Sequence, residues 1–67
     1  MKKQIAEASS QLTLEQQVAI LLDAKEYYQE CVCDGMNRVE AQAATEAYHL
    51  NRLTAMVNDK VLTELGL

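Results

Sequence analysis

The stretch Cys33-Asp34-Gly35-Met36-Asn37 lies at the middle of this 67-residue chain and decides its fold. Gly35 is one of only two glycines in a chain that has no proline. Because glycine reaches positive φ without a steric penalty, it commonly ends a helix. Asn37 followed by Glu40 is typical of a helix N-cap with a capping box. The stretch therefore predicts that one helix ends and another begins within a few residues.

The first long helix is expected over residues 14–33, after a capping box formed by Thr13 and Gln16. At about 100° per residue, its apolar side chains spread over an arc of about 200°. The main stripe holds Leu14, Val18, Leu21, Tyr28 and Val32, with Leu22 on one side and Ile20, Ala24, Tyr27 and Cys31 on the other. The remaining arc is acidic and polar, and we expect it to face solvent.

The second long helix is expected over residues 38–65. Its main stripe holds Val39, Ala43, Ala47, Leu50, Val57, Val61 and Leu65, and a smaller apolar side holds Ala41, Ala44, Tyr48, Ala55 and Leu62. In an antiparallel hairpin, the alanine-rich start of this helix meets Tyr27 and Tyr28, and its Leu- and Val-rich end meets Leu14 and Val18. Matching small against large side chains in this way favours the hairpin.

Residues 1–12 form either a short separate helix or a mobile tail. If one straight helix ran from residue 1 through residue 33, Ile5 and Leu12 would lie on its acidic side instead of its apolar side. This mismatch predicts a break in the helix around residues 9–11. Residues 13–67 are then a single helical-hairpin domain. A chain of this size buries little apolar surface alone, and the wide apolar arcs exceed what one neighbouring helix covers. We expect an all-α hairpin that completes a four-helix bundle by dimerisation, or that binds a different protein.

Catalytic, cofactor-binding and metal-binding patterns are not found. His49 is the single histidine and is expected to be solvated, beside Glu46 and Arg52. Cys31 and Cys33 lie two residues apart, on different sides of a helix, so we interpret them as reduced thiols with Cys31 in the core. We therefore expect no enzyme activity, no cofactor and no metal.

The charge distribution disfavours nucleic acid as a partner. The chain has ten acidic and six basic residues, a net charge of −4, and Lys25 is the only basic residue between positions 4 and 34. The alternative is a helix-turn-helix regulator that binds nucleic acid through Lys2, Lys3, Arg38, Arg52 and Lys60. No secretory signal or membrane span is visible, so we expect a cytoplasmic protein that does not interact with membranes.

The function that these features favour is a small, non-enzymatic protein-binding module: an adaptor, a co-chaperone or an inhibitor or other regulator. Aromatic residues and methionine recur at helix interfaces, which makes Tyr27, Tyr28 and Met56 the candidate anchors. The acidic residues of the first long helix are expected to steer the partner electrostatically, and they are Glu15, Asp23, Glu26 and Glu30.

In length and in the placement of its turn, the chain resembles the plasmid Rop hairpins and the E-type co-chaperones of type III secretion needles. The resemblance implies a two-helix chain that acts by binding protein or as a phage- or plasmid-encoded regulator. It extends to layout alone, because neither a Gly-Asp pair nor a Pro-x-x-Tyr sequence follows the turn. No functional residue is transferred from either family.

Overall fold

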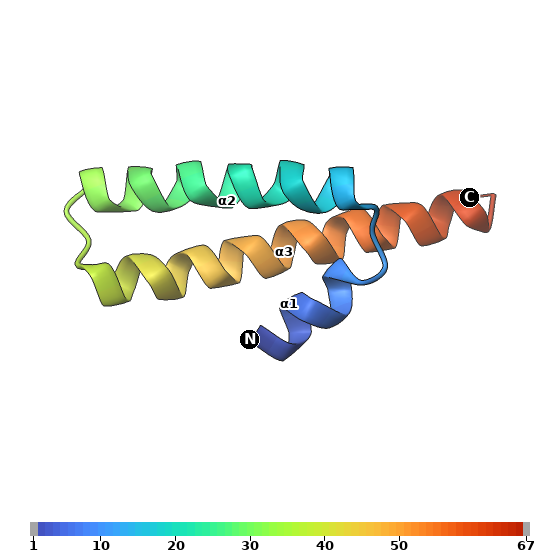
Figure 1. Cartoon of the computed structure of the whole chain (residues 1–67), viewed down its shortest axis with the longest axis horizontal. Coiled ribbons are helices and arrows are strands. Elements are labelled where there is room, and N and C mark those ends of the chain that lie inside the picture. The colour runs from blue at the N-terminus through green and yellow to red at the C-terminus, as the bar shows by residue number, and fades with distance from the viewer. Residues whose placement is uncertain (1, 67) are drawn as a thin grey trace.

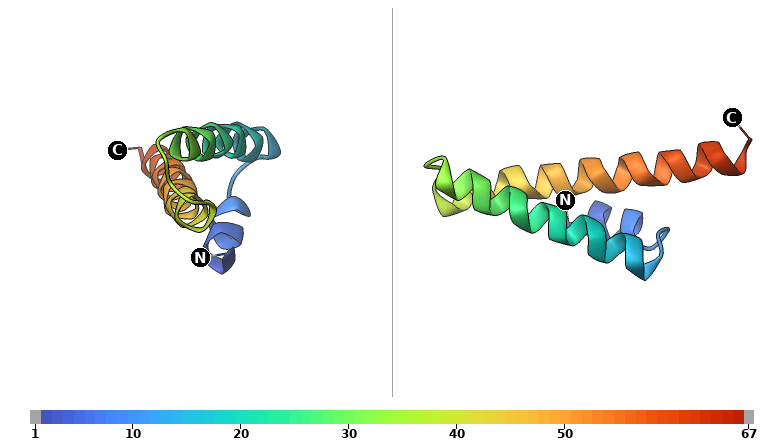
Figure 2. Two further views of the ribbon diagram at one scale, coloured as in Figure 1. Left: turned by 90° about the vertical axis from the view of Figure 1, so that its left-hand side faces the viewer. Right: turned by 90° about the horizontal axis from the view of Figure 1, so that it is seen from above.

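The computed structural model describes residues 2–66, which form three helices and no strand (Figure 1). Helix α1 spans Lys2–Ser9, α2 spans Leu14–Cys33 and α3 spans Arg38–Glu64. Helices α2 and α3 run antiparallel, whereas the helices of a helix-turn-helix motif cross at roughly 90–120°. Seen end-on, α2 and α1 lie against two different sides of α3 (Figure 2). The all-α prediction is confirmed, and the N-terminal segment contains the short helix.

The predicted caps are present at the start of both long helices. Thr13 Oγ1 accepts a hydrogen bond from the Gln16 amide at 3.2 Å, and Gln16 Oε1 accepts one from the Thr13 amide at 3.0 Å. Asn37 Oδ1 accepts from the Glu40 amide at 2.9 Å. The return bond to Glu40 Oε1 comes from the Asn37 side-chain amide, at 2.6 Å, instead of the backbone. Each cap satisfies helix N–H groups that have no partner within the helix.

Gly35 ends α2 in the way that the sequence predicts. Its φ is +97°, and its amide donates to the Val32 carbonyl at 3.1 Å. The Met36 amide donates to the Cys31 carbonyl, also at 3.1 Å. These two bonds form a Schellman motif, which satisfies the last carbonyls of α2 and turns the chain toward α3.

Helix α1 is held in place where it ends. The Gln17 side-chain amide donates to the Ser9 carbonyl at 2.6 Å and to the Leu12 carbonyl at 3.0 Å. The Lys60 ammonium group donates to the Gln11 carbonyl at 2.9 Å. Carbonyls at a helix C-terminus lack intrahelical partners, so these two side chains, one from α2 and one from α3, stabilise the turn that follows α1.

The core is small and joins all three parts of the fold. Leu12, Ile20 and Leu53 form its buried centre, and Leu53 is fully buried. The side chains packed against this centre come from α1 and α3, and they are Ile5, Ala8, Met56 and Val57. Helix α1 therefore covers the part of α3 that α2 leaves open.

The predicted packing of Leu14 and Val18 against the end of α3 is wrong. Leu14 is 76% exposed and Val18 is 47% exposed. The buried face of α2 is formed by the set that flanks the expected main stripe, namely Ile20, Ala24 and Cys31, and the buried residues of α3 are Ala41 and Leu53. The physical reason is that Ala24, Cys31 and Ala41 are small and let the helices approach closely, while α1 occupies the site expected for Leu14 and Val18.

None of the helices within residues 2–66 is both long and apolar enough to cross a bilayer.

Replacing the fully buried leucine tests the small core. We expect Leu53→Ala to lower the free energy of unfolding by about 2–5 kcal/mol, because it removes buried methyl groups and leaves a cavity. Leu21→Ala is the matched control, since the same atoms are removed from a side chain that is 57% exposed. Its effect is expected to stay within about 0.5 kcal/mol. Urea denaturation measures both, and equal effects would contradict the core assignment.

Candidate protein-binding surface

Helix α2 presents three faces, and only one of them packs within the chain. Its inward face centres on Ile20, Ala24 and Cys31. About 120° around the helix lies a row of exposed apolar side chains, here called the α2 strip. The strip consists of Leu14, Val18, Leu21, Leu22 and Val32, all of them at least 46% exposed. These are the members of the expected main stripe and its Leu22 flank, except for the half-buried Tyr28.

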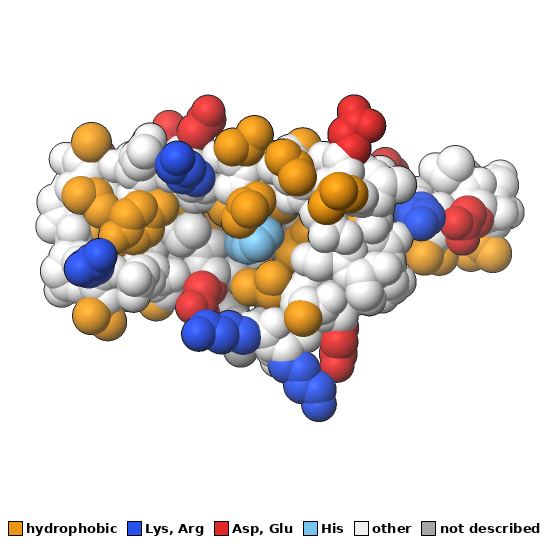
Figure 3. All heavy atoms as spheres, in the orientation of Figure 1, with side chains coloured by type: hydrophobic (Ala, Val, Ile, Leu, Met, Phe, Trp, Pro, Cys, Tyr) orange, Lys and Arg blue, Asp and Glu red, His pale blue; other side chains and the backbone are white. Residues whose placement is uncertain are grey.

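Four of the five strip residues gather in the first half of α2, and Lys25 and Gln29 separate them from Val32, so the strip differs from the single exposed leucines that are common on protein surfaces. Figure 3 shows hydrophobic side chains gathered over α2, with acidic side chains at the upper edge of this face. Full burial of a Val or Leu side chain contributes about 1.5–3 kcal/mol. The strip therefore offers enough apolar surface to support binding of another helix.

Exposed carboxylates lie on the face of α2 that adjoins the Leu22 side of the strip. Glu15, Glu26 and Glu30 are all exposed, and we call them the acidic row. Glu26 and Glu30 also line a shallow groove that continues to Cys33 and Asp34. The acidic row thus gives the surface beside the strip a negative potential.

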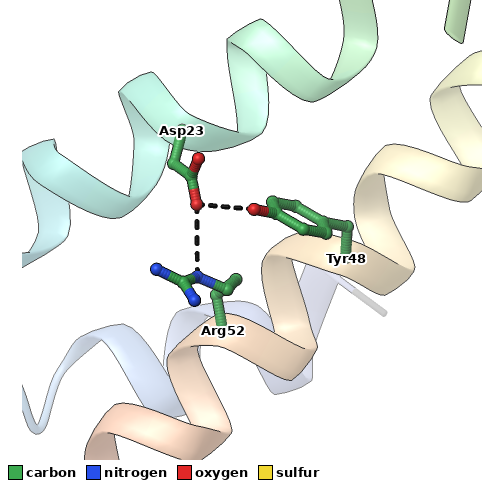
Figure 4. Close-up of polar contacts among 3 residues, drawn as sticks. All are labelled: Asp23, Tyr48 and Arg52. Atoms are coloured by element: carbon green, nitrogen blue, oxygen red, sulfur yellow. Dashed lines mark hydrogen bonds and ion pairs between the residues drawn. The ribbon is translucent and has the colours of Figure 1, made fainter. Parts of the chain in front are cut away.

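Asp23, the fourth predicted acidic residue, is engaged inside the hairpin. Tyr48 Oη donates a hydrogen bond to Asp23 Oδ2 at 2.6 Å, and Arg52 Nε lies 3.2 Å from the same oxygen (Figure 4). The Asp23 side chain is 36% exposed, so the ion pair is partly screened by water. Because Tyr48 and Arg52 lie one turn apart on α3, the contact fixes the rotation of α3 against α2.

An aromatic stack continues this contact along the hairpin. The rings of Tyr27 and Tyr48 are 4.2 Å apart between centroids and nearly parallel, at 2°. The hydrogen bond to Asp23, with burial and the Asp23 charge adding to it, raises the pKa of Tyr48. Electrostatic interaction with the nearby Cys31 raises the pKa of Tyr27, and burial adds to the effect. Both tyrosines are therefore favoured in their neutral form.

The three predicted anchors occupy different environments. Tyr27 is half-buried in the stack with Tyr48, and Met56 packs against the core. Tyr28 is half-buried on α2, next to the strip in helical phase. Within the hairpin, Tyr27 and Met56 already have packing partners, and Tyr28 is the anchor that lies nearest to the exposed apolar surface.

Sequence reasoning did not identify the contact of Asp23 with Tyr48 and Arg52. A signal was present, because Tyr48 shares a helical face with Ala41 and Ala44, and Arg52 lies one turn further along it. Alanine side chains are less hydrophobic than leucine and valine, so hydrophobic phase ranks this face below the main stripe of α3.

Helix α3 carries its own exposed apolar residues at both ends. Val39 is 75% exposed near its start, and Leu65 is 66% exposed just after its end. Val61 and Leu62 are exposed as well. Figure 1 shows the C-terminal turns of α3 extending past both α1 and α2.

The two cysteines and the single histidine differ in their exposure to solvent. Cys31 is buried and Cys33 is exposed, and both are free thiols, as expected for this pair. His49 is half-buried instead of solvated, because it lies one turn from the fully buried Leu53. Among residues 2–66, no group of three or more His, Cys, Asp or Glu side chains is arranged to hold a metal ion.

Comparison with known proteins found no match to this chain among protein-family models, curated proteins or solved structures.

The raised pKa of Tyr48 makes the stability of the hairpin dependent on alkaline pH. A pKa above 10.0 in the folded state stabilises the fold at every pH below 10, and this contribution is lost as the pH rises through the raised value. We expect the stability difference between the wild type and Tyr48→Phe to be constant near neutral pH and to shrink above pH 10. Urea denaturation followed by circular dichroism measures it. Tyr28→Phe, which preserves the Asp23 contact, is the control, and a difference that grew with pH would refute the assignment.

Proposed function

We propose that this chain is a small, non-enzymatic protein-binding module, of the kind that acts as an adaptor, a co-chaperone, an inhibitor or another regulator. The observation that supports it is the α2 strip, because the most continuous apolar stripe of α2 faces outward while the hairpin is held together by another face. Helices that bind a partner present such an apolar stripe with a polar edge.

The bound protein is a second copy of this chain, a different protein, or both. A second copy would complete a four-helix bundle and cover exposed apolar residues at the ends of α3, such as Val39 and Leu65. The small core supports this part of the proposal, since a chain with so few buried side chains gains stability from assembly. The free thiols of Cys31 and Cys33 are consistent with a reducing compartment, and we propose a cytoplasmic location.

Light scattering of the purified protein tests self-association. We expect twice the mass of a single chain, with a fraction of dimer that falls on dilution because two chains associate reversibly. A monomer at all accessible concentrations would contradict the dimer and leave a different protein as the partner.

A charge placed in the α2 strip tests the role of this surface. We expect Leu21→Glu to weaken partner binding about 10- to 100-fold, because the side chain no longer contributes apolar burial and brings a charge into the interface. The measurement is affinity capture from an extract of the source organism, quantified by mass spectrometry against the wild type.

Asn58→Glu is the matched control, since it adds the same charge at an exposed position of α3. Proteins that bind through the strip are retained by Asn58→Glu and lost with Leu21→Glu. If the wild type, Leu21→Glu and Asn58→Glu all captured the same set of proteins, the result would contradict the proposal. Circular dichroism confirms that each variant keeps its helices.

A further inference from the structure

The charges beside the α2 strip define the partner that it fits. The acidic row of Glu15, Glu26 and Glu30 is exposed along one edge, and Lys25 is the only basic residue of α2. Lys25 projects into the strip, where its stem can pack against apolar neighbours while its ammonium group reaches water. A bound helix therefore meets apolar side chains and the Lys25 stem at the centre of the contact, and carboxylates along one edge.

A second copy of this chain does not match that edge. If two strips pair antiparallel about a two-fold axis, the axis places both acidic rows on the same side of the interface. If they pair parallel, each row meets the opposite edge of the other α2, which is formed by Gln17 and Tyr28 and has no cation. In either arrangement six glutamates are opposed by two copies of Lys25, and like charges at close range repel. Self-association is better served by the exposed residues of α3.

We propose that the α2 strip binds an amphipathic helix of another protein, one that carries Lys or Arg along one edge of its apolar stripe. Burial of the strip supplies affinity, and pairing with the acidic row supplies orientation and the rate of association. Helix α2 has 20 residues, so at about 1.5 Å per residue it accommodates a partner helix of about five turns. This inference rests on the proposed function and adds the chemistry of the partner.

Designed helical peptides test the charge preference directly. The first probe is a 20-residue peptide with leucines at i, i+3, i+4 and i+7 spacing and lysines along one edge. Its acidic twin has glutamate in place of each lysine, and a scrambled peptide keeps the basic composition without the apolar stripe. Fluorescence anisotropy with the full chain measures each dissociation constant at low and at high ionic strength.

We expect the basic peptide to bind about tenfold more tightly than its acidic twin at low salt, because three carboxylates face its lysines. The preference should shrink at about 0.5 M salt, where exposed charges are screened, while binding through the apolar stripe remains. Equal affinity for the two twins would overturn the proposal. So would tight binding of the scrambled peptide, which would show attraction by net charge alone.

Paired variants separate the acidic row from the overall charge of the chain. Glu26→Gln combined with Glu30→Gln should remove most of the preference for the basic peptide. The control combines Glu7→Gln with Glu64→Gln, which removes the same charge from exposed positions on α1 and α3, and the preference should persist. Equal losses in the two double variants would overturn the proposal.

Failure here is distinguishable from failure of the proposed function. If Leu21→Glu abolishes capture of a partner but the peptides show no charge preference, the strip is a binding surface for a helix of another character. If Leu21→Glu changes neither capture nor peptide binding, the strip is not a binding surface and both proposals fail.

Discussion

The contact of Asp23 with Tyr48 and Arg52 is the constraint on which the arrangement of the helices depends. One carboxylate oxygen accepts a hydrogen bond from Tyr48 at 2.6 Å and lies 3.2 Å from the Arg52 guanidinium, so α2 and α3 must turn these faces toward each other. Small buried residues on the same side, Ala24 and Ala41, allow the close approach that the contact needs. The more hydrophobic stripe of α2 lies outside this packed face.

In our proposal, this arrangement links the stability of the fold to partner binding. The core of Leu12, Ile20 and Leu53 is small, and it depends on α1 to close one side of α3. The chain holds its fold with few buried side chains and leaves a long apolar strip at the surface. A protein of this design gains stability when the strip is covered, because a ligand that binds only the folded state stabilises it. Binding and folding are therefore thermodynamically coupled in our proposal.

In our proposal, the α2 strip and the exposed apolar residues of α3 bind different partners. The α2 strip is bordered by the acidic row, which favours a partner of opposite charge over a second copy of the same surface. The exposed residues of α3 lie at its two ends, and its C-terminal turns extend past the other helices (Figure 1). In our proposal, the module associates with itself through one surface and binds a different helix through the other.

The sequence by itself determined the two long helices, their limits and the turn between them, and left residues 1–12 open between a short helix and a tail. Gly35, Thr13 and Asn37 act through hydrogen bonds within a few residues, so their effect can be read without knowledge of the rest of the chain. Tertiary structure alone decided which face of each helix is buried. Hydrophobic phase ranked the stripe of Leu14 and Val18 first, because it counts apolar side chains and not how closely two backbones can approach. Close packing of small residues, the position of α1 and a single carboxylate shared between Tyr48 and Arg52 reversed that ranking, and all three are contacts between residues distant in sequence.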